Sequence, residues 1–286
     1  MAEIQIEQAI WVSASRGFRL LARSPGFPDE WLADAEELCV AFGDRLAGVS
    51  CPECVFAQPF GRRHVAVVQV ADQSADLSNR AGLGFHQLVF RRRDYPLLAG
   101  DPFALAERFP PPWSSRGDLS TLSTEPVAAP RTVEDVQQVL KRPEGPALLG
   151  GVQALLDGGR VVFQRPAPDT NLLQSLWTLL PTSNRCELWP ASFTFSNALR
   201  FDVMAASRPT GEAYAGYLTE EQAGDYPQGR YELSLQQAAE GGDQAELDAL
   251  FARRSRAQTW RLGWLILFAM LALLAVMNLL KMVMRR

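Results

Sequence analysis

The sequence predicts an α/β (α+β) head of one or two subdomains, followed by one C-terminal transmembrane helix. The head is indicated by short segments of alternating apolar and polar residues, which lie between capped helical patterns. The transmembrane helix is indicated by the run 262–280, LGWLILFAMLALLAVMNLL, which contains no charged residue. At about 1.5 Å per residue a helix of this length measures roughly 28 Å, close to the ~30 Å hydrocarbon thickness of a bilayer.

The composition of this run favours insertion over burial in a protein core. Ten of the residues from Trp264 to Leu280 are Leu, Ile, Phe or Val, which together contribute roughly −3 to −6 kcal/mol toward insertion. The alternative is a buried core helix. Such a helix usually keeps a polar edge, whereas this run is apolar on every face.

The N-terminal α/β domain is expected over residues 1–113. Its elements are a strand over 4–14, a helix over 29–42 capped by Asp29, a hairpin of 55–59 and 64–70 around Phe60-Gly61-Arg62-Arg63, a strand over 84–91 and a short helix over 102–109. Residues 114–131 are rich in Ser, Thr, Pro and small side chains, which is typical of a linker.

A second α/β subdomain is expected over 132–205. Its elements are a helix over 133–141 capped by Thr132, a helix over 146–157, a strand over 160–165, a helix from Asp169 or Thr170 to Leu180, and strands over 191–195 and 199–205. Residues 206–258 form a loop-rich segment and a juxtamembrane helix. That polar helix, 243–258, is expected to continue into the transmembrane helix.

The net charge of the head and its N-terminal sequence indicate which partners to expect and where the protein is located. All 32 acidic residues and 24 of the 28 basic residues precede Gln258, so the head carries a net charge of −8. Nucleic acid is therefore not expected as a partner, because phosphate binding needs a basic face. The N-terminus has two acids before its short apolar run, unlike a secretory signal. We expect a single-pass, tail-anchored protein of the cell membrane, with its head in the cytoplasm.

Basic residues flank the transmembrane run on both sides and are expected to contact lipid head groups. An arginine near an anionic membrane surface contributes about 1 kcal/mol to binding. The residues concerned are Arg253, Arg254, Arg256 and Arg261 before the run, and Lys281, Arg285 and Arg286 after it.

Four cysteines suggest a reducing compartment and leave one metal-binding or enzymatic alternative open. Cys51 and Cys54 have the spacing of a zinc knuckle or a redox pair, and Cys39 and His64 could complete a zinc site. We expect no metal and no cofactor, since Cys39 fits the buried face of a helix. The loop after the strand at 160–165 lacks the glycines of a phosphate-binding loop, and the common hydrolase signatures are absent.

Three sequence blocks carry a resemblance to a known family. They are Ser15–Pro28 (SRGFRLLARSPGFP), Asn79–Phe90 (NRAGLGFHQLVF), and Leu179–Pro181 with Arg185 before Ser192–Ser196 (SFTFS). In this order they resemble the N-terminal and middle regions of bacterial GTPase-associated proteins, thought to act as adaptors beside small GTPases. The resemblance implies a non-catalytic α/β adaptor with Arg80, His86 and Arg185 in the shared blocks. The C-terminal helix replaces the further domains of larger relatives.

These observations lead us to expect a membrane-anchored, non-catalytic adaptor that recruits a cytosolic protein, with a GTPase as the candidate partner. The residues expected to contact that partner are Arg80, His86, Arg91, Arg92, Arg93 and Arg185. One alternative is a membrane-bound enzyme or zinc protein that uses Cys51 or Cys54 with a histidine. Another is that the anchor itself pairs with a second helix through Ala269, Ala272 and Ala275.

Overall fold

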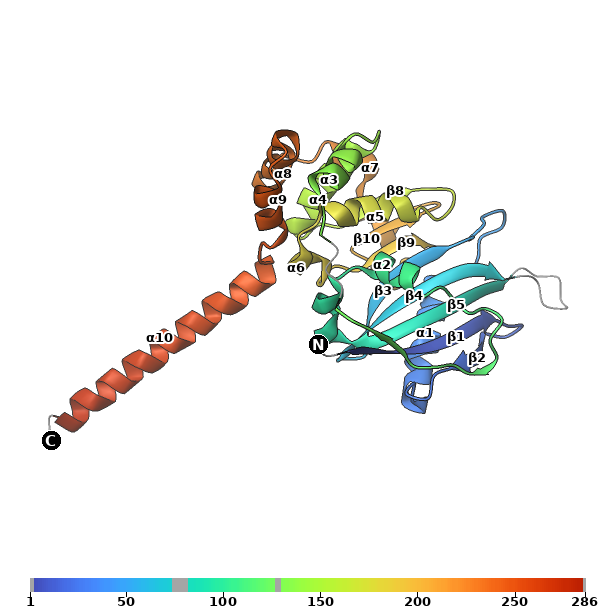
Figure 1. Cartoon of the computed structure of the whole chain (residues 1–286), viewed down its shortest axis with the longest axis horizontal. Coiled ribbons are helices and arrows are strands. Elements are labelled where there is room, and N and C mark those ends of the chain that lie inside the picture. Colours follow the sequence, from blue (N-terminus) through green and yellow to red (C-terminus); the bar gives the residue numbers. More distant parts are fainter. Residues whose placement is uncertain (1–2, 74–81, 127–129, 285–286) are drawn as a thin grey trace.

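The computed structural model describes residues 3–73, 82–126 and 130–284; in the last helix, the side chains of residues 256, 257, 275, 276 and 278–284 are not described. The head is built on one sheet of eleven strands, in the order β11-β8-β10-β9-β3-β4-β5-β1-β2-β6, with β7 paired to β1 (Figure 1). The strands are β1 (Ile4–Ser13), β2 (Phe18–Arg23), β3 (Cys54–Phe60), β4 (His64–Gln73), β5 (Gly82–Arg91), β6 (Gly117–Asp118), β7 (Leu122–Thr124), β8 (Val161–Gln164), β9 (Pro190–Thr194), β10 (Val203–Ala206) and β11 (Leu218–Thr219).

One half of the sheet is antiparallel except for its edge strand β6, which pairs parallel with β2, and it is covered on both faces. Strands β3, β4, β5, β1 and β2 pair antiparallel in series. Helix α1 (Leu32–Phe42) lies on one face, where Gln87 of β5 donates to the Ala35 carbonyl at 2.7 Å. The 3-10 segment η2 (Arg92–Leu98) and helix α2 (Pro102–Arg108) follow β5, and Gln69 of β4 donates to the Phe109 carbonyl at 2.7 Å on the other face.

The other half is parallel and is surrounded by helices. Strands β9, β10, β8 and β11 pair parallel with one another, an arrangement that normally requires helices on both faces. The helices gathered around it (Figure 1) are α3 (Val133–Leu140), α4 (Gly145–Leu156), α5 (Thr170–Leu179), α6 (Thr182–Arg185), α7 (Glu220–Gly224), α8 (Arg230–Gly241) and α9 (Gln244–Phe251). A short 3-10 turn, η3 (Glu212–Tyr214), lies between β10 and β11.

The two halves share a hydrophobic core. Strand β3 pairs antiparallel with β9 at Phe56 and Ala191, and the Val55 amide donates to the Ser192 hydroxyl at 2.8 Å. Buried side chains from β1 through α9 form one contiguous cluster. The segment 114–131, expected to be a linker, contributes β6 and β7 to this sheet. The division into domains therefore stays a prediction, while the mixed α/β fold class is shown.

Several expected elements differ at their ends. Residues 29–31 form a 3-10 turn (η1), and Asp29 pairs with Arg23 instead of capping α1. The polar helix expected over 243–258 is two elements, because α9 ends at Phe251 and helix α10 (Arg256–Met284) begins after a break. The Ser255 hydroxyl causes this break, since it accepts from the Gln258 amide at 3.2 Å and starts a new helix.

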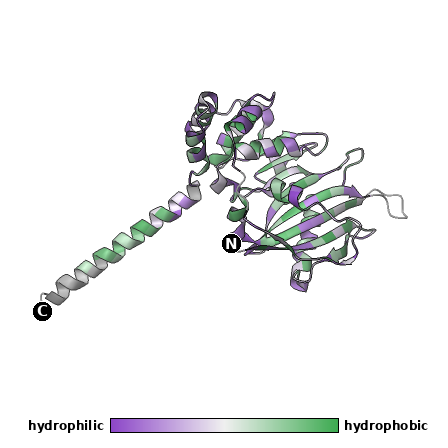
Figure 2. Cartoon of the chain, viewed as in Figure 1, coloured by the Kyte–Doolittle hydropathy of each residue, from purple (hydrophilic) through white to green (hydrophobic). Residues whose placement is uncertain are grey.

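Helix α10 projects away from the head and is apolar along most of the part that Figure 2 colours (Figures 1 and 2). Its large apolar side chains are exposed, from 41% for Leu262 to 66% for Leu265. Over the part of the chain that the structure describes, no helix combines the length and the apolar character needed to cross a membrane. The transmembrane assignment accordingly remains an inference from the sequence.

Candidate functional site

The predicted contact residues Arg91, Arg92 and Arg93 lie beside two further arginines at one end of the sheet. Strand β5 ends at Arg91, which is opposite His64 at the start of β4. The turn between β3 and β4 carries Arg62 and Arg63, and the Arg92 amide donates to the Arg63 carbonyl at 2.8 Å. All five arginine side chains are exposed. We call this set, Arg62, Arg63, Arg91, Arg92 and Arg93, the arginine end of the sheet.

The charge of the arginine end is only partly compensated. Arg93 lies 3.6 Å from Asp94, and among the described residues this is the one ion pair that these arginines form. The Arg92 guanidinium lies 5.6 Å from the Trp189 ring centroid, a cation–π arrangement that leaves its charge in place. Burial, and after it the charges of Arg91 and Arg63, lower the pKa of His64. Such a basic surface on an acidic head suits an acidic partner.

Arg62 and Arg63 were not predicted to belong to this set. Their signal was present in the sequence, because the hairpin turn Phe60-Gly61-Arg62-Arg63 was expected. The local sequence pattern does not show which strand pairs with the second strand of that hairpin. The register of β4 with β5 is what brings the two arginine runs together.

Two of the expected contact residues are buried, which corrects their assignment. His86 is 0% exposed and Arg185 is 4% exposed, so neither side chain is available on the surface for a protein partner. His86 bridges Gln8 and Gln69, with its Nε2 at 2.9 Å from Gln8 Oε1 and its Nδ1 at 3.3 Å from Gln69 Nε2. Arg80 lies outside the described residues.

The cysteines of the enzymatic alternative are buried, and Cys54 lies at the opposite end of the β3–β4 pairing from His64. Cys51 and Cys54 are both 0% exposed, and a hydrogen bond to Cys54 together with burial raises the pKa of the Cys51 thiol. The Cys54 thiol donates to the Phe193 carbonyl at 3.1 Å. Cys39 contacts Gln87 at 3.4 Å, whereas the His64 ring packs on Trp31. In the ranges that the structure covers, no three His, Cys, Asp or Glu side chains gather as a metal site.

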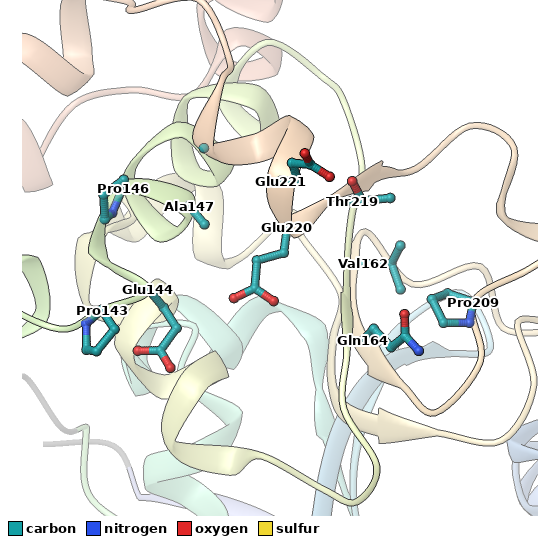
Figure 3. A pocket seen from close by; sticks show the side chains of 11 residues that line it. Pro143, Glu144, Pro146, Ala147, Val162, Gln164, Pro209, Thr219, Glu220 and Glu221 are labelled. Carbon is teal, nitrogen blue, oxygen red and sulfur yellow. The ribbon is translucent and has the colours of Figure 1, made fainter.

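A hollow of about 750 Å³ lies at the carboxyl end of the parallel strands (Figure 3). This is the edge where open α/β sheets usually bind ligands. Gln164 ends β8, Thr219 ends β11, and Glu220 starts α7 beside them. In Figure 3 the Glu220 carboxylate lies centrally, with Glu144 on one side and Gln164 on the other.

The charges around this hollow disfavour a phosphate ligand. Arg165 holds Glu220 through two hydrogen bonds, at 2.6 and 2.9 Å, and also approaches Asp169 at 3.3 Å. These partners, the bidentate Glu220 first, raise the pKa of Arg165. Glu144 and Glu221 complete an acidic lining. A cationic group is the ligand chemistry that this acidic lining favours.

A second hollow, of about 740 Å³, lies at the base of α10. The predicted lipid-contact residues Arg253 and Arg254 line it together with Trp260, and all three side chains are exposed. The Ser183 hydroxyl donates to the Arg253 carbonyl at 2.6 Å, and the Ser255 hydroxyl to Glu187 at 2.8 Å. These bonds fix the start of α10 to the head. The side chains of Arg256, Lys281, Arg285 and Arg286 lie outside the described part, and Arg261 is exposed.

A scan against models of protein families found no match, and a search of curated proteins likewise found none.

Proposed function

We propose that this chain is a membrane-anchored, non-catalytic adaptor whose cytoplasmic head recruits an acidic protein partner. The observation that carries the proposal is helix α10, whose described apolar side chains are exposed from Trp260 to Met277. Leaving so much contiguous apolar surface in water is unfavourable, and such a surface marks an interaction site. The uncharged run of the sequence also continues to Leu280, past the last described side chain.

The position of the arginines next to the apolar run also supports insertion of α10 into a bilayer. Ser255 begins α10 immediately after the head, and Arg253, Arg254 and Arg261 lie close to the start of the apolar run. That placement puts arginines at the level of lipid head groups when the run is inserted. Confining the head to a membrane raises its effective concentration for any partner held on the same surface.

The arginine end of the sheet supports the adaptor part of the proposal. Its five exposed arginines contrast with the head's net charge of −8, so it is a local basic surface on an acidic body. The resemblance to GTPase-associated proteins makes a small GTPase system the first candidate partner. In this proposal Arg91, Arg92 and Arg93 contact the partner, together with Arg62 and Arg63.

Membrane anchoring is tested by placing charges in the apolar run. The double substitution Leu267→Arg/Leu271→Arg adds about 5–7 kcal/mol of insertion cost, which offsets the favourable −3 to −6 kcal/mol of the run. We expect the full-length wild-type protein to stay in the membrane fraction after an alkaline carbonate wash. The double variant should move to the soluble fraction.

The matched control keeps the helix apolar. Leu267→Ile/Leu271→Ile should remain in the membrane fraction like the wild type. A wild-type protein that is fully soluble, with its α10 helices covered by other copies in an oligomer, would contradict the proposed anchor.

A further inference from the structure

A small cavity of about 150 Å³ lies between the η2–α2 segment and helices α5 and α6. Four of its lining residues are apolar, and the other six are three arginines, two threonines and one aspartate. The polar residues are Asp101, Arg108, Thr124, Arg131, Thr178 and Arg185. About five water molecules occupy this volume in liquid water, so the cavity is large enough for a small polyatomic ion.

Arg185 is the most buried charge in this cavity, and its guanidinium is incompletely paired. It is 4% exposed, its Nε donates to the Trp177 carbonyl at 2.7 Å, and its Nη1 is 3.5 Å from an Asp101 oxygen. Its Nη2 has no hydrogen-bond partner among the described residues. A guanidinium carries five N–H donors, so most of these donors are left for another acceptor.

Arg131 adds a second, half-buried cation whose hydrogen-bond partners are all neutral. Its Nη1 donates to the carbonyls of Thr178, at 2.9 Å, and Leu180, and its Nη2 to the Thr182 hydroxyl at 3.0 Å. The guanidinium stacks on the Phe251 ring. Burial, and after it the charge of Arg185, lowers the pKa of Arg131 to about 9. It therefore remains charged at neutral pH.

The negative charge in the cavity does not balance these cations. Asp101 is the one carboxylate among the described lining residues, and it also accepts from the backbone amides of Phe103 and Ala104 as the cap of α2. Arg108, at the other end of α2, is exposed and adds a third cation to the lining. Buried charges are normally paired, and the buried Arg185 has only the 3.5 Å contact with Asp101. With Arg131 and Arg108 beside it, the lining has an excess of positive charge that an anion would balance.

We propose that this cavity binds a small oxyanion of the phosphate class, held by Arg185, Arg131 and Arg108. The unmatched N–H donors of Arg185 supply charge-assisted hydrogen bonds, which are the strongest that proteins offer to phosphate oxygens. Arg131 supplies charge from within the cavity wall, and Arg108 adds donors from an exposed position. This site does not depend on the membrane anchor or on the arginine end of the sheet.

The test uses the full-length protein in detergent micelles with inorganic phosphate as the probe. Thermal unfolding is followed during a phosphate titration, with sodium chloride keeping the ionic strength constant. We expect a saturable rise in Tm, since a ligand that binds only the folded state stabilises it by mass action. The same amount of glutarate should give a smaller rise. No saturable phosphate effect, or an equal effect of glutarate, would overturn the proposal.

Two variants and a control locate the binding site. Arg108 is exposed, so Arg108→Gln should unfold like the wild type without phosphate yet bind phosphate about tenfold more weakly. Arg185→Gln should abolish the rise in Tm with phosphate. If Arg185→Gln does not fold, the result for Arg108→Gln alone tests the proposal. Arg16 lies in an exposed loop after the C-terminal end of β1, so Arg16→Gln should bind phosphate like the wild type. Equal weakening by Arg16→Gln and Arg108→Gln would contradict a specific site.

Discussion

At the scale of single residues, the buried polar network around His86 shows how this sheet keeps a titratable group neutral. Gln8 Nε2 donates to the Ser120 carbonyl at 2.7 Å, so its Oε1 faces His86 and accepts from the imidazole Nε2. The other ring nitrogen then accepts from Gln69. Both contacts suit the neutral imidazole, and burial lowers the pKa of His86 to about 4.

This lowered pKa predicts that the protein loses stability in mild acid. Between an unfolded-state pKa of about 6.5 and the folded value, only the unfolded chain binds the proton, so the free energy of unfolding falls as pH falls. The loss from His86 between pH 7.5 and 4.5 should be about 2–3 kcal/mol. Urea unfolding of His86→Gln should show a flatter pH dependence over this range. His64→Gln should keep most of the wild-type slope; a wild-type slope in His86→Gln would contradict the assignment.

Gly150 is the residue that allows α4 and α7 to pack closely. A Cβ atom there would lie 2.0 Å from the carbonyl oxygen of Ala223, a backbone atom that cannot rotate away. We expect Gly150→Ala to lower the free energy of unfolding by about 1–3 kcal/mol, measured by urea unfolding. Gly241 in α8 has no such neighbour within 4 Å, so Gly241→Ala should be neutral or stabilising by up to about 1 kcal/mol. Equal effects of the two substitutions would disprove this packing argument.

Residue patterns predicted some local features well and missed others. Thr132, and either Asp169 or Thr170, were expected as helix caps; Thr132 and Asp169 accept backbone amides at the start of α3 and α5. Their short polar side chains act within one helical turn, so the signal is local. The burial of Arg185 was not foreseen, because it depends on α5, η2 and α2 meeting around it.

At the scale of elements, strand pairing decides which charged runs become neighbours. The hairpin of β3 and β4 and the strand β5 were expected, with ends close to those observed. Their mutual register was not, and that register places Arg63 beside Arg91 and Arg92. The break between α9 and α10 was also missed, since the Arg253–Arg256 run looks like a continuing polar helix until Ser255 is recognised as a cap.

The arginine end predicts a charge-dependent interaction with the partner. Replacing Arg91, Arg92 and Arg93 with Glu should abolish co-purification of stoichiometric partners from native membranes in mild detergent, because opposite charges at an interface become like charges. The partners are identified by mass spectrometry. Arg16→Glu, in a loop at the opposite end of β1, is the single-site control. Unchanged partners in the triple variant would remove the arginine end from the proposal.

At the scale of the whole molecule, the fold of the head depends on contacts between distant parts of the sequence, whereas the apolar run of α10 is one continuous stretch. The two halves of the sheet share a core, which fixes the hollow at β8 and β11 and the arginine end within one folded unit. Local patterns predicted strands and helices in both halves but not their union through β3 and β9, which are more than a hundred residues apart in the sequence. The apolar run of α10 is a continuous stretch of sequence, so it could be recognised from the sequence alone.

The central claim, a cytoplasmic head held by an inserted α10, is tested most directly by protease protection in bacterial cells. Spheroplasts and inverted membrane vesicles that contain the full-length protein are treated with a protease, and the head is detected with an antibody. We expect the head to be protected in intact spheroplasts and digested in inverted vesicles. Digestion in spheroplasts, or a head that washes off both kinds of membrane, would contradict the account.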